Sequence, residues 1–227
     1  MRIDTFVFLI IMSNTSPDIK AIRTDYGKHY LLEGEVNKNP LEQFKVWLHE
    51  AIRFKVNEPN AMNVSTLNQE GYPTSRIVLL RDIDHEGFTF FTNYNSHKGI
   101  EVAHNPKVGL TFFWPELERQ VRVCGEIVKV DEKVSDDYFN SRPRQSQLGA
   151  LVSNQSAVLK DREELERAEK ELEKKFAGKP VPRPKHWGGY LVKPVSVEFW
   201  QGRPSRLHDR LLYSKEGDNW NLTRLAP

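Results

Sequence analysis

Apolar and polar residues alternate in five short segments in the first half of the chain, and a period of two predicts β-strands. These segments are residues 61–67, 75–83, 87–94, 108–114 and 119–130. They are rich in β-branched and aromatic residues, and the sequences NQEGYP and DHEG between them are typical of hairpin turns. Short strands at this spacing favour an antiparallel barrel over a parallel sheet.

Helical spacing appears on both sides of these strands. Asn39 followed by Pro40 predicts a helix start, and the apolar residues 44, 47, 48, 51 and 52 place one helix face in the core until residues 58–60 end it. Further helices are expected in residues 96–106, 131–143 and 161–176. A rigid linker is expected at 178–189, before a strand at 195–200 and a hairpin at 210–225.

The net charge, the longest apolar run and the cysteine content argue against several classes of protein. The chain of 227 residues has 33 Lys and Arg against 31 Asp and Glu, a net charge of +2, which argues against nucleic-acid binding as the main function. The apolar run 6–12 is shorter than the roughly 20 residues of a membrane helix, and one hypothesis is that translation begins at Met12. No spacing of His and Cys supports a zinc site, and the single cysteine, Cys124, indicates a reducing compartment.

Two basic segments lie close to the predicted strands. Arg76 and Arg81 are five residues apart in SRIVLLR, so they should point to opposite faces of a regular strand. In TNYNSHKG, Thr92, His97 and Lys98 cluster before a short helix, and hydroxyl groups, a lysine and free backbone N–H groups at a helix start suit a phosphate.

Two more basic segments follow in the second half. YFNSRPRQSQLGA contains Arg142 without an acidic neighbour, and Pro143 would place Ser146 in the first turn of the next helix. In EFWQGRPSRLHDR, Trp200 precedes three arginines, and a guanidinium can stack on a flat ring while it binds an oxyanion. Two phosphate-suited sites with aromatic walls would accommodate a phosphorylated ring cofactor and a phosphorylated ring substrate.

These motifs, in this order, resemble the pyridoxine (pyridoxamine) 5′-phosphate oxidase family, from about residue 23 to the C-terminal RLAP. The resemblance implies a mainly β fold with flanking helices (α+β), an antiparallel FMN-binding split β-barrel that works as a homodimer with FMN between subunits. Residues 1–39 would form a mobile arm and 40–227 a single domain, in which 186–227 serve dimerisation and substrate binding. The implied reaction oxidises pyridoxine or pyridoxamine 5′-phosphate to pyridoxal 5′-phosphate, with oxygen giving hydrogen peroxide.

The resemblance also assigns residues. The implied FMN contacts are Arg76, Ile77, Val78, Leu79, Leu80, Arg81, Phe91, Thr92, His97, Lys98, Gln120, Gln155, Ser156, Trp200 and Arg210. The implied substrate contacts are Arg23, Tyr26, Arg81, Tyr138, Arg142, Ser146, Arg206 and His208. Arg206 is expected to be the catalytic residue that holds and polarises the substrate near C4′, with His208 assisting.

Two positions depart from the family pattern. Arg81 stands where lysine is usual, which keeps the charge and changes its geometry. His97 stands where arginine is usual, and because an ordinary histidine is neutral above pH ~7, FMN should bind more weakly there.

Alternatives with the same fold are a flavin reductase or a deazaflavin-dependent reductase, which would not need both RPRQS and RLHDR. A non-enzymatic carrier of FMN or pyridoxal phosphate would need the same phosphate ligands, and turnover with oxygen would distinguish it. No metal, membrane or nucleic-acid partner is expected, and the cytoplasm is the expected location.

Overall fold

The computed structural model describes residues 18–21 and 23–227, so the expectations about residues 6–12 and the start at Met12 lie outside the described residues. Its strands are β1 (Ala61–Leu67), β2 (Pro73–Leu79), β3 (Asp82–Ile83), β4 (Phe88–Asn93), β5 (Lys107–Trp114), β6 (Arg119–Lys129), β7 (Trp187–Gln201), β8 (Asp209–Glu216) and β9 (Asn219–Arg224). Its α-helices are α1 (Pro40–Arg53), α2 (His97–His104), α3 (Glu132–Ser141), α4 (Arg144–Val152) and α5 (Arg162–Lys175).

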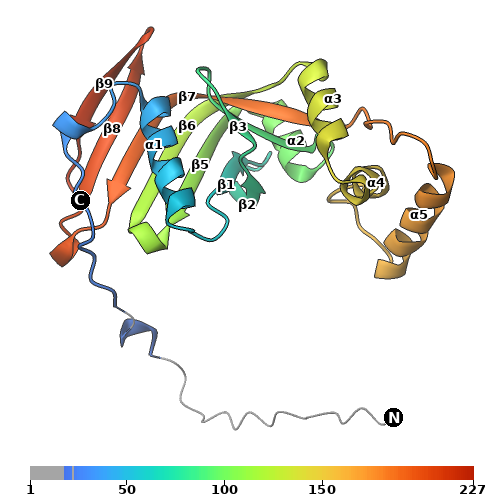
Figure 1. The fold of residues 1–227 in the computed structure, drawn as a ribbon, viewed down its shortest axis with the longest axis horizontal. Coiled ribbons are helices and arrows are strands. Elements are labelled where there is room, and N and C mark those ends of the chain that lie inside the picture. The colour runs from blue at the N-terminus through green and yellow to red at the C-terminus, as the bar shows by residue number, and fades with distance from the viewer. Residues whose placement is uncertain (1–17, 22) are drawn as a thin grey trace.

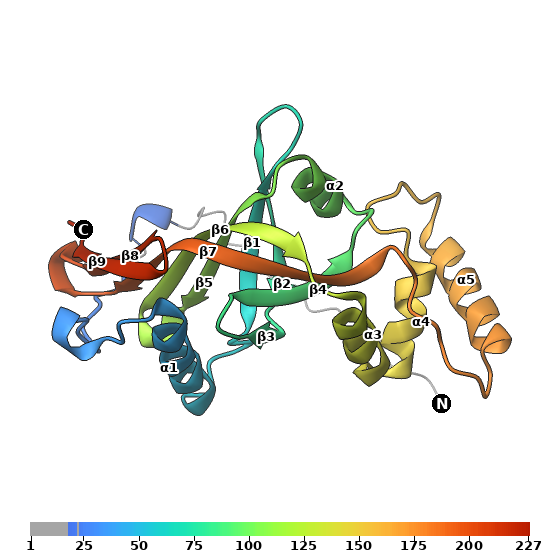
Figure 2. The ribbon, with the colours of Figure 1, turned by 90° about the horizontal axis from the view of Figure 1, so that it is seen from above.

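All strand pairs are antiparallel, as the spacing of the short strands predicted, and β7 connects the two parts of the sheet. The order is β2-β1-β5-β6-β7-β4-β3, with β8 on β7 and β9 on β8. One edge of β7 pairs with β6, while the other pairs first with β4, at residues 187–192, and then with β8, at residues 196–201. The sheet therefore divides along β7, with α3 to α5 at one end and β8 and β9 at the other (Figures 1 and 2).

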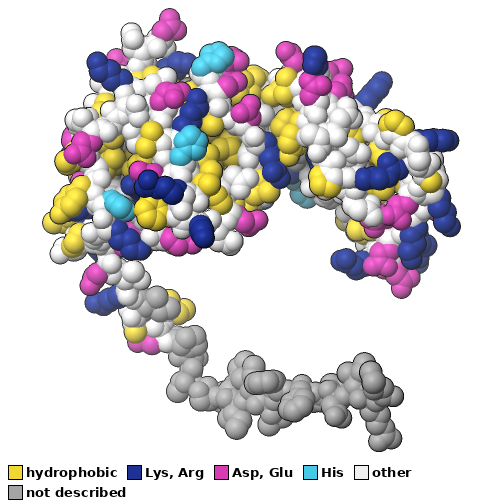
Figure 3. All heavy atoms as spheres, viewed as in Figure 1, with side chains coloured by type: hydrophobic (Ala, Val, Ile, Leu, Met, Phe, Trp, Pro, Cys, Tyr) yellow, Lys and Arg dark blue, Asp and Glu magenta, His cyan; other side chains and the backbone are white. Residues whose placement is uncertain are grey.

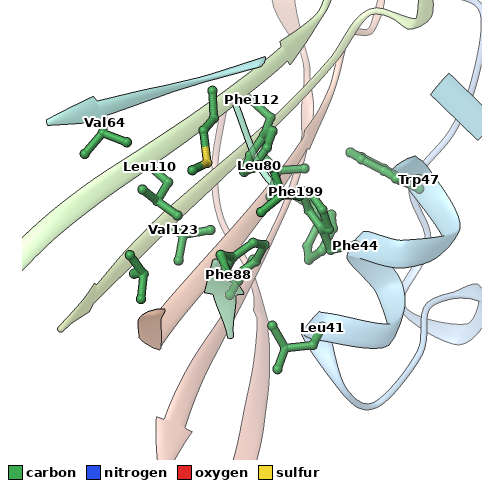
Figure 4. Packing of buried hydrophobic residues seen from close by; sticks show 14 of the residues in the cluster. Leu41, Phe44, Trp47, Val64, Leu80, Phe88, Leu110, Phe112, Val123 and Phe199 are labelled. Carbon is green, nitrogen blue, oxygen red and sulfur yellow. The ribbon is translucent and has the colours of Figure 1, made fainter. Parts of the chain in front are cut away.

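The main core lies between α1 and the sheet. Asn39 caps α1 by accepting a hydrogen bond from the backbone N–H of Leu41, as the Asn–Pro signal predicted. Phe44 is fully buried, and its ring lies 5.0 Å from that of Phe88 and 4.7 Å from that of Phe112 (Figure 4). On the outer surface, acidic and basic side chains are interspersed, as the small net charge implies (Figure 3).

Three boundaries differ from the sequence prediction. Helix α1 ends at Arg53, and Ile52 is exposed rather than buried. The strand expected at 75–83 stops at Leu79, and a short β3 follows after a break. The expected linker ends early because β7 begins at Trp187. Its glycines are part of the strand, since a Cβ on Gly188 would lie 2.2 Å from the Tyr94 hydroxyl.

Candidate functional site

A cavity of about 720 Å³ lies between β2, β4, the start of α2, α3 and α4, and this volume is in the range of small-molecule sites. It brings together most of the residues that the resemblance assigned. Those that line it are Arg76, Ile77, Val78, Leu79, Arg81, Phe91, Thr92, His97, Lys98, Tyr138, Arg142, Ser146, Gln155 and Ser156. Sequence reasoning missed Asn93 and Trp187, which also line it.

Lys98 lies in the first turn of α2 and is almost fully buried. Its Nζ bonds to Thr92 Oγ1 at 3.0 Å, Ser96 Oγ at 3.1 Å and Gln155 Oε1 at 2.9 Å, so its partners are neutral. Burial, and then the nearby charge of Arg76, lower the pKa of Lys98 to about 8. A desolvated ammonium among neutral groups at a helix start is suited to an incoming phosphate.

The Arg76 guanidinium is held by residues of β1, of α2 and of its own strand β2. Its Nη2 donates to Glu101 Oε2 at 3.1 Å and to Thr74 Oγ1 at 2.7 Å, and its Nη1 donates to Thr66 Oγ1 at 2.5 Å. Glu101 lies on α2, and the hydrogen bonds that it accepts lower its pKa against the opposing effect of burial. This carboxylate orients Arg76 toward the cavity, and nothing in the local sequence indicated it.

Arg142 forms a second cationic subsite at the C-terminal end of α3. Its guanidinium carbon lies 4.5 Å from the centroid of Trp187, and its Nη1 is buried without a hydrogen-bond partner among the described residues. Burial, and then the charge of Arg81, lower the pKa of Arg142. A buried, unsatisfied N–H of a cation costs stability unless an anion completes it, so this group is prepared for a ligand.

The position of Arg81 differs from the prediction made from strand periodicity. Arg76 and Arg81 were predicted to point to opposite faces, yet both line the same cavity. The reason is that β2 ends at Leu79, and the backbone N–H of Arg81 already bonds to the carbonyl of Thr89 at 2.8 Å, so the period of two does not extend to it. Leu80, one of the residues assigned to FMN, packs in the core at 5% exposure.

Aromatic rings form one wall of this cavity. The rings of Phe91 and Tyr138 stack with centroids 3.9 Å apart, and Trp187 stacks on Phe91 at 5.7 Å. The Arg81 guanidinium lies 5.9 Å from the Tyr138 ring. The wall therefore fixes the positions of both Arg81 and Arg142.

Arg144 has a structural role, although the sequence placed it in the same basic segment as Arg142. Its guanidinium donates to the carbonyl oxygens of Phe176 at 2.6 Å and Lys179 at 3.1 Å, and Phe176 is the C-cap of α5. A cation at the C-terminal end of a helix satisfies free carbonyl groups. The two arginines are therefore distinct in function.

The remaining predicted residues lie at the other end of the sheet. A second pocket of about 570 Å³ is lined by Arg23, Tyr26, Arg203, Arg206 and His208, among others. Ser205 and Arg206 have positive φ angles of 57° and 63°, a conformation that costs roughly 1–3 kcal/mol per non-glycine residue. These two residues form a tight turn, and the second half of the RPSRLHDR motif follows it.

His208 has a defined orientation in this pocket. Its Nδ1 accepts a hydrogen bond from the backbone N–H of Arg203 at 3.1 Å, so the proton of the neutral ring is on Nε2. Burial, and then the charge of Arg206, lower the pKa of His208. The ring lies 4.6 Å from Trp200 and 5.9 Å from Tyr26, centroid to centroid.

Gln120, Trp200 and Arg210 form a row across three strands, because Trp200 pairs with Gln120 of β6 on one side and with Arg210 of β8 on the other. Arg210 Nε donates to Glu198 Oε1 at 2.9 Å, and this hydrogen bond raises the pKa of Arg210. Glu198 was not predicted, although it lies two residues before Trp200 and thus shares its face of β7.

The two regions are far apart within one chain. Trp187 of the first cavity and Gln201 beside the second pocket are the ends of β7, and a strand of this length spans about 45 Å at ~3.3 Å per residue. One ligand cannot contact both regions of the same chain. Within residues 18–21 and 23–227, no metal-ligating cluster was found and no helix is long and apolar enough to span a membrane.

Comparisons with known proteins match both regions. Residues 48–176 match the family described as pyridoxamine 5′-phosphate oxidase, and residues 187–227 match the pyridoxine 5′-phosphate oxidase C-terminal dimerisation region. The pyridoxine/pyridoxamine 5′-phosphate oxidase of Cyanothece sp. is 53% identical over 92% of this chain and 98% of its own length. The protein of the same name from Nostoc punctiforme is 53% identical over 91% and 97%.

Solved structures agree with these matches. PhzG from Burkholderia lata, determined with tetrahydrophenazine-1-carboxylic acid, superposes with a TM-score of 0.84 at 30% identity, over 89% of this chain and all of that one. An FMN-binding protein from Nostoc punctiforme related to pyridoxamine 5′-phosphate oxidase shares the fold, with a TM-score of 0.66 at 16% identity over 83% and 98%. The chain therefore belongs to the pyridoxine/pyridoxamine 5′-phosphate oxidase family and has that family's dimerisation region at its C-terminal end.

Proposed function

We propose that this chain is an FMN-dependent oxidase that converts pyridoxine 5′-phosphate and pyridoxamine 5′-phosphate to pyridoxal 5′-phosphate, with oxygen as the electron acceptor and hydrogen peroxide as the second product. One observation carries the assignment of the substrate site. The buried Arg142 Nη1 has no partner among the described residues and shares a cavity with Lys98, which has only neutral partners. The cavity thus offers two separate anion subsites, as two phosphorylated ligands require.

The subsite around Lys98 fits the phosphate of FMN. Lys98 and Arg76 supply charge, the first turn of α2 supplies N–H groups, and Ser156 supplies a hydroxyl that also accepts from the backbone N–H of His97 at 3.2 Å. Residues 77–79 of β2 line the cavity beside it, where a flat ring would lie along the strand. FMN held by these residues would supply a hydride acceptor for the substrate and a route for the electrons to oxygen.

The subsite around Arg142 fits the phosphate of the substrate. Arg142 and Arg81 supply the charge, and Tyr138 and Ser146, which each carry a hydroxyl group, line the same cavity. The contact with the Trp187 ring restricts the Arg142 guanidinium, so it loses little freedom when it binds an oxyanion.

The second pocket completes the site of the partner subunit. The proposed contacts from this region are Gln120, Trp200 and Arg210 to FMN, and Arg23, Tyr26, Arg206 and His208 to the substrate. Because β7 separates them from the first cavity of the same chain, they can act only on ligands bound by the other copy of the homodimer. Arg206 holds and polarises the substrate near C4′, and His208, whose pKa is lowered by burial, assists it.

The direct test is the absorbance spectrum of the purified protein, followed by addition of pyridoxine 5′-phosphate in air. A yellow protein that forms pyridoxal 5′-phosphate and peroxide is expected. A yellow protein that forms neither would favour a reductase or a carrier.

A subunit-complementation experiment tests the shared site. At a pyridoxine 5′-phosphate concentration well below the wild-type KM, Arg142→Met and Arg206→Met homodimers should each have little activity. In mixed dimers one site contains both substitutions and the other contains neither, so random reassortment should restore about a quarter of the wild-type activity. No recovery after verified subunit exchange would contradict a site built from two chains.

Location in the cytoplasm remains part of this proposal and is supported by the single cysteine, Cys124.

A further inference from the structure

We infer that Glu118 is a positioning residue for the substrate site. It binds the backbone of residues 23–31 and so holds Tyr26 against Trp200 and His208. These residues are part of the predicted N-terminal arm 1–39, and in this subsection 'the arm' means residues 23–31 alone. The inference rests on the proposed function in one respect, because Tyr26 and His208 are taken to contact the substrate. The attachment of the arm itself is independent of any activity.

Glu118 lies in the turn between β5 and β6, directly after the 3₁₀ helix Pro115–Leu117. Its side chain is nearly excluded from solvent, with the residue 4% exposed. One carboxylate oxygen, Oε2, accepts hydrogen bonds from the backbone N–H groups of Gly27 at 2.8 Å and Lys28 at 3.0 Å. These two donors belong to irregular backbone, which has few other partners to replace a buried carboxylate.

The same turn also holds the segment that carries Arg206 and His208. The backbone carbonyl of Glu118 accepts from the N–H of Gly202 at 2.8 Å and from Gln201 Nε2 at 3.2 Å. Glu118 therefore connects the arm, through its side chain, to the segment after β7, through its backbone. Its φ of 55° lies in the left-handed region, which directs the side chain and the carbonyl group to these separate partners.

The contact between the arm and the pocket is tight. The Tyr26 ring meets Trp200 edge-on at 5.7 Å and lies 5.9 Å from His208. A Cβ on Gly202 would lie only 2.7 Å from Tyr26 Cγ, so the ring occupies space that only glycine leaves free. A small displacement of the arm at Gly27 would move Tyr26 out of this position.

Glu116, two residues earlier, provides a matched control. Lys28 Nζ bonds to its backbone carbonyl at 2.7 Å, whereas its carboxylate makes no hydrogen bond within the part of the chain that the structure describes. Removing either carboxylate changes the net charge equally, yet of these two glutamates Glu118 alone binds the arm through its carboxylate.

The test compares Glu118→Ala, Glu118→Gln and Glu116→Ala as holoenzymes with pyridoxine 5′-phosphate. We expect the KM of Glu118→Ala to rise about tenfold, as the loss of two charge-assisted hydrogen bonds would allow, with kcat and the FMN Kd within about twofold of wild type. Glutamine still offers an acceptor oxygen, so Glu118→Gln should recover most of the affinity. Glu116→Ala should match wild type.

Limited digestion with trypsin gives a readout that needs no activity. Cleavage after Arg23 and Lys28 should be several-fold faster in Glu118→Ala than in wild type and Glu116→Ala, because a released arm enters a protease more readily. If wild type makes no pyridoxal 5′-phosphate, the proposed function fails while the digestion still decides whether Glu118 holds the arm.

Gly202→Ala provides a second route to the same state, because its Cβ displaces Tyr26 directly. It should also raise KM, and it keeps the inference testable if Glu118→Ala does not fold. Wild-type KM and wild-type cleavage in Glu118→Ala would overturn the inference. Equal losses in kcat, KM and FMN affinity would also overturn it, since they would indicate a general structural role.

Discussion

The two ends of β7 hold their cations in different ways. In the cavity beside α2 and α4, Lys98 has neutral partners and Arg142 keeps a buried N–H without a partner among the described residues. In the region around β8, two arginines, Arg203 and Arg210, already have carboxylate partners, as Arg76 of the first cavity has in Glu101. Arg210 pairs with Glu198 at 2.9 Å, and Arg203 with Asp209 at 3.5 Å.

This difference separates two tasks. Unpaired, desolvated cations favour an anion strongly, because they gain a partner that folding did not provide. Cations that are already paired bind an anion less strongly but hold fixed positions, which suits the orientation of a ring. This contrast is the basis of our proposal that the first region supplies affinity for phosphate and the second supplies geometry at the reacting carbon.

The largest expected effect is in the second region, where a substitution should affect the reaction without affecting the cofactor. Arg206→Met should lower kcat/KM by about 10²-fold or more, since it removes a charge at the reacting end of the substrate. Steady-state kinetics and the flavin absorbance of the same sample measure both quantities. A near-normal rate, or loss of bound FMN, would contradict the division of tasks.

A substitution in the first region should affect substrate affinity. Arg142→Met should raise the KM for pyridoxine 5′-phosphate by about 10- to 100-fold, the loss expected for a charge-assisted contact to phosphate, while the FMN Kd stays unchanged. Arg144→Ala is the matched control, because Arg144 caps α5 and should affect only thermal stability. A similar KM increase in both variants would show that the effect is not specific to Arg142.

The burial of Lys98 predicts a pH dependence. Its pKa is lowered to about 8, so above pH 8 the cofactor-free protein must take up a proton before the ammonium can bind phosphate. The deprotonation of Lys98 should therefore make the FMN Kd rise above pH 8, toward tenfold per pH unit. Fluorescence titration of the cofactor-free protein measures it.

The same titration tests the departure at position 97. The His97→Arg variant should remove any change in Kd below pH 8 and leave the rise above it. A Lys98→Met variant should bind FMN more weakly but with no rise above pH 8, and a persistent rise would assign the effect to another group.

The smallest expected effect on FMN affinity comes from removing the carboxylate partner of a paired arginine. Glu198→Gln should raise the FMN Kd only about three- to fivefold, because a partly exposed ion pair contributes little and Arg210 keeps its place opposite Trp200. Arg122→Ala removes the more exposed partner of Glu198 and should leave FMN affinity unchanged. A loss as large as that of Arg142→Met would mean that the two regions do not differ.

The sequence predicted most of the fold because local signals were strong. β1 has the predicted bounds, β4 to β6 lie within a residue or so of them, and the short helix after the TNYNS segment is α2. The Asn–Pro start of α1 was also confirmed, since a capping side chain acts over only two residues.

The errors came from places where tertiary packing overrides a local pattern. Gly188 and Gly189 indicated a linker, but they belong to β7 because Tyr94 and Phe91 fill the space where their side chains would lie. Arg76 and Arg81 share a cavity because the strand ends between them.

The supporting residues of the site were beyond sequence reasoning for a similar reason. Trp187 stacks on Arg142 from 45 positions along the chain, and Glu101 reaches Arg76 from another element. Without resemblance, such contacts have no local signal, since only the folded sheet brings the groups together.

The length of β7 has a consequence for how this chain can change. An added or removed residue in the strand would turn every later side chain to the opposite face and shift the β8 half by about 3 Å against the β4 half. By contrast, α5 packs on α4 at the edge of the molecule (Figure 1), so the part of their connecting loop that follows Ser156, residues 157–161, can change length without moving either half or the cavity residues Gln155 and Ser156. Insertions should therefore be tolerated in that part of the loop, whereas insertions in β7 should abolish activity.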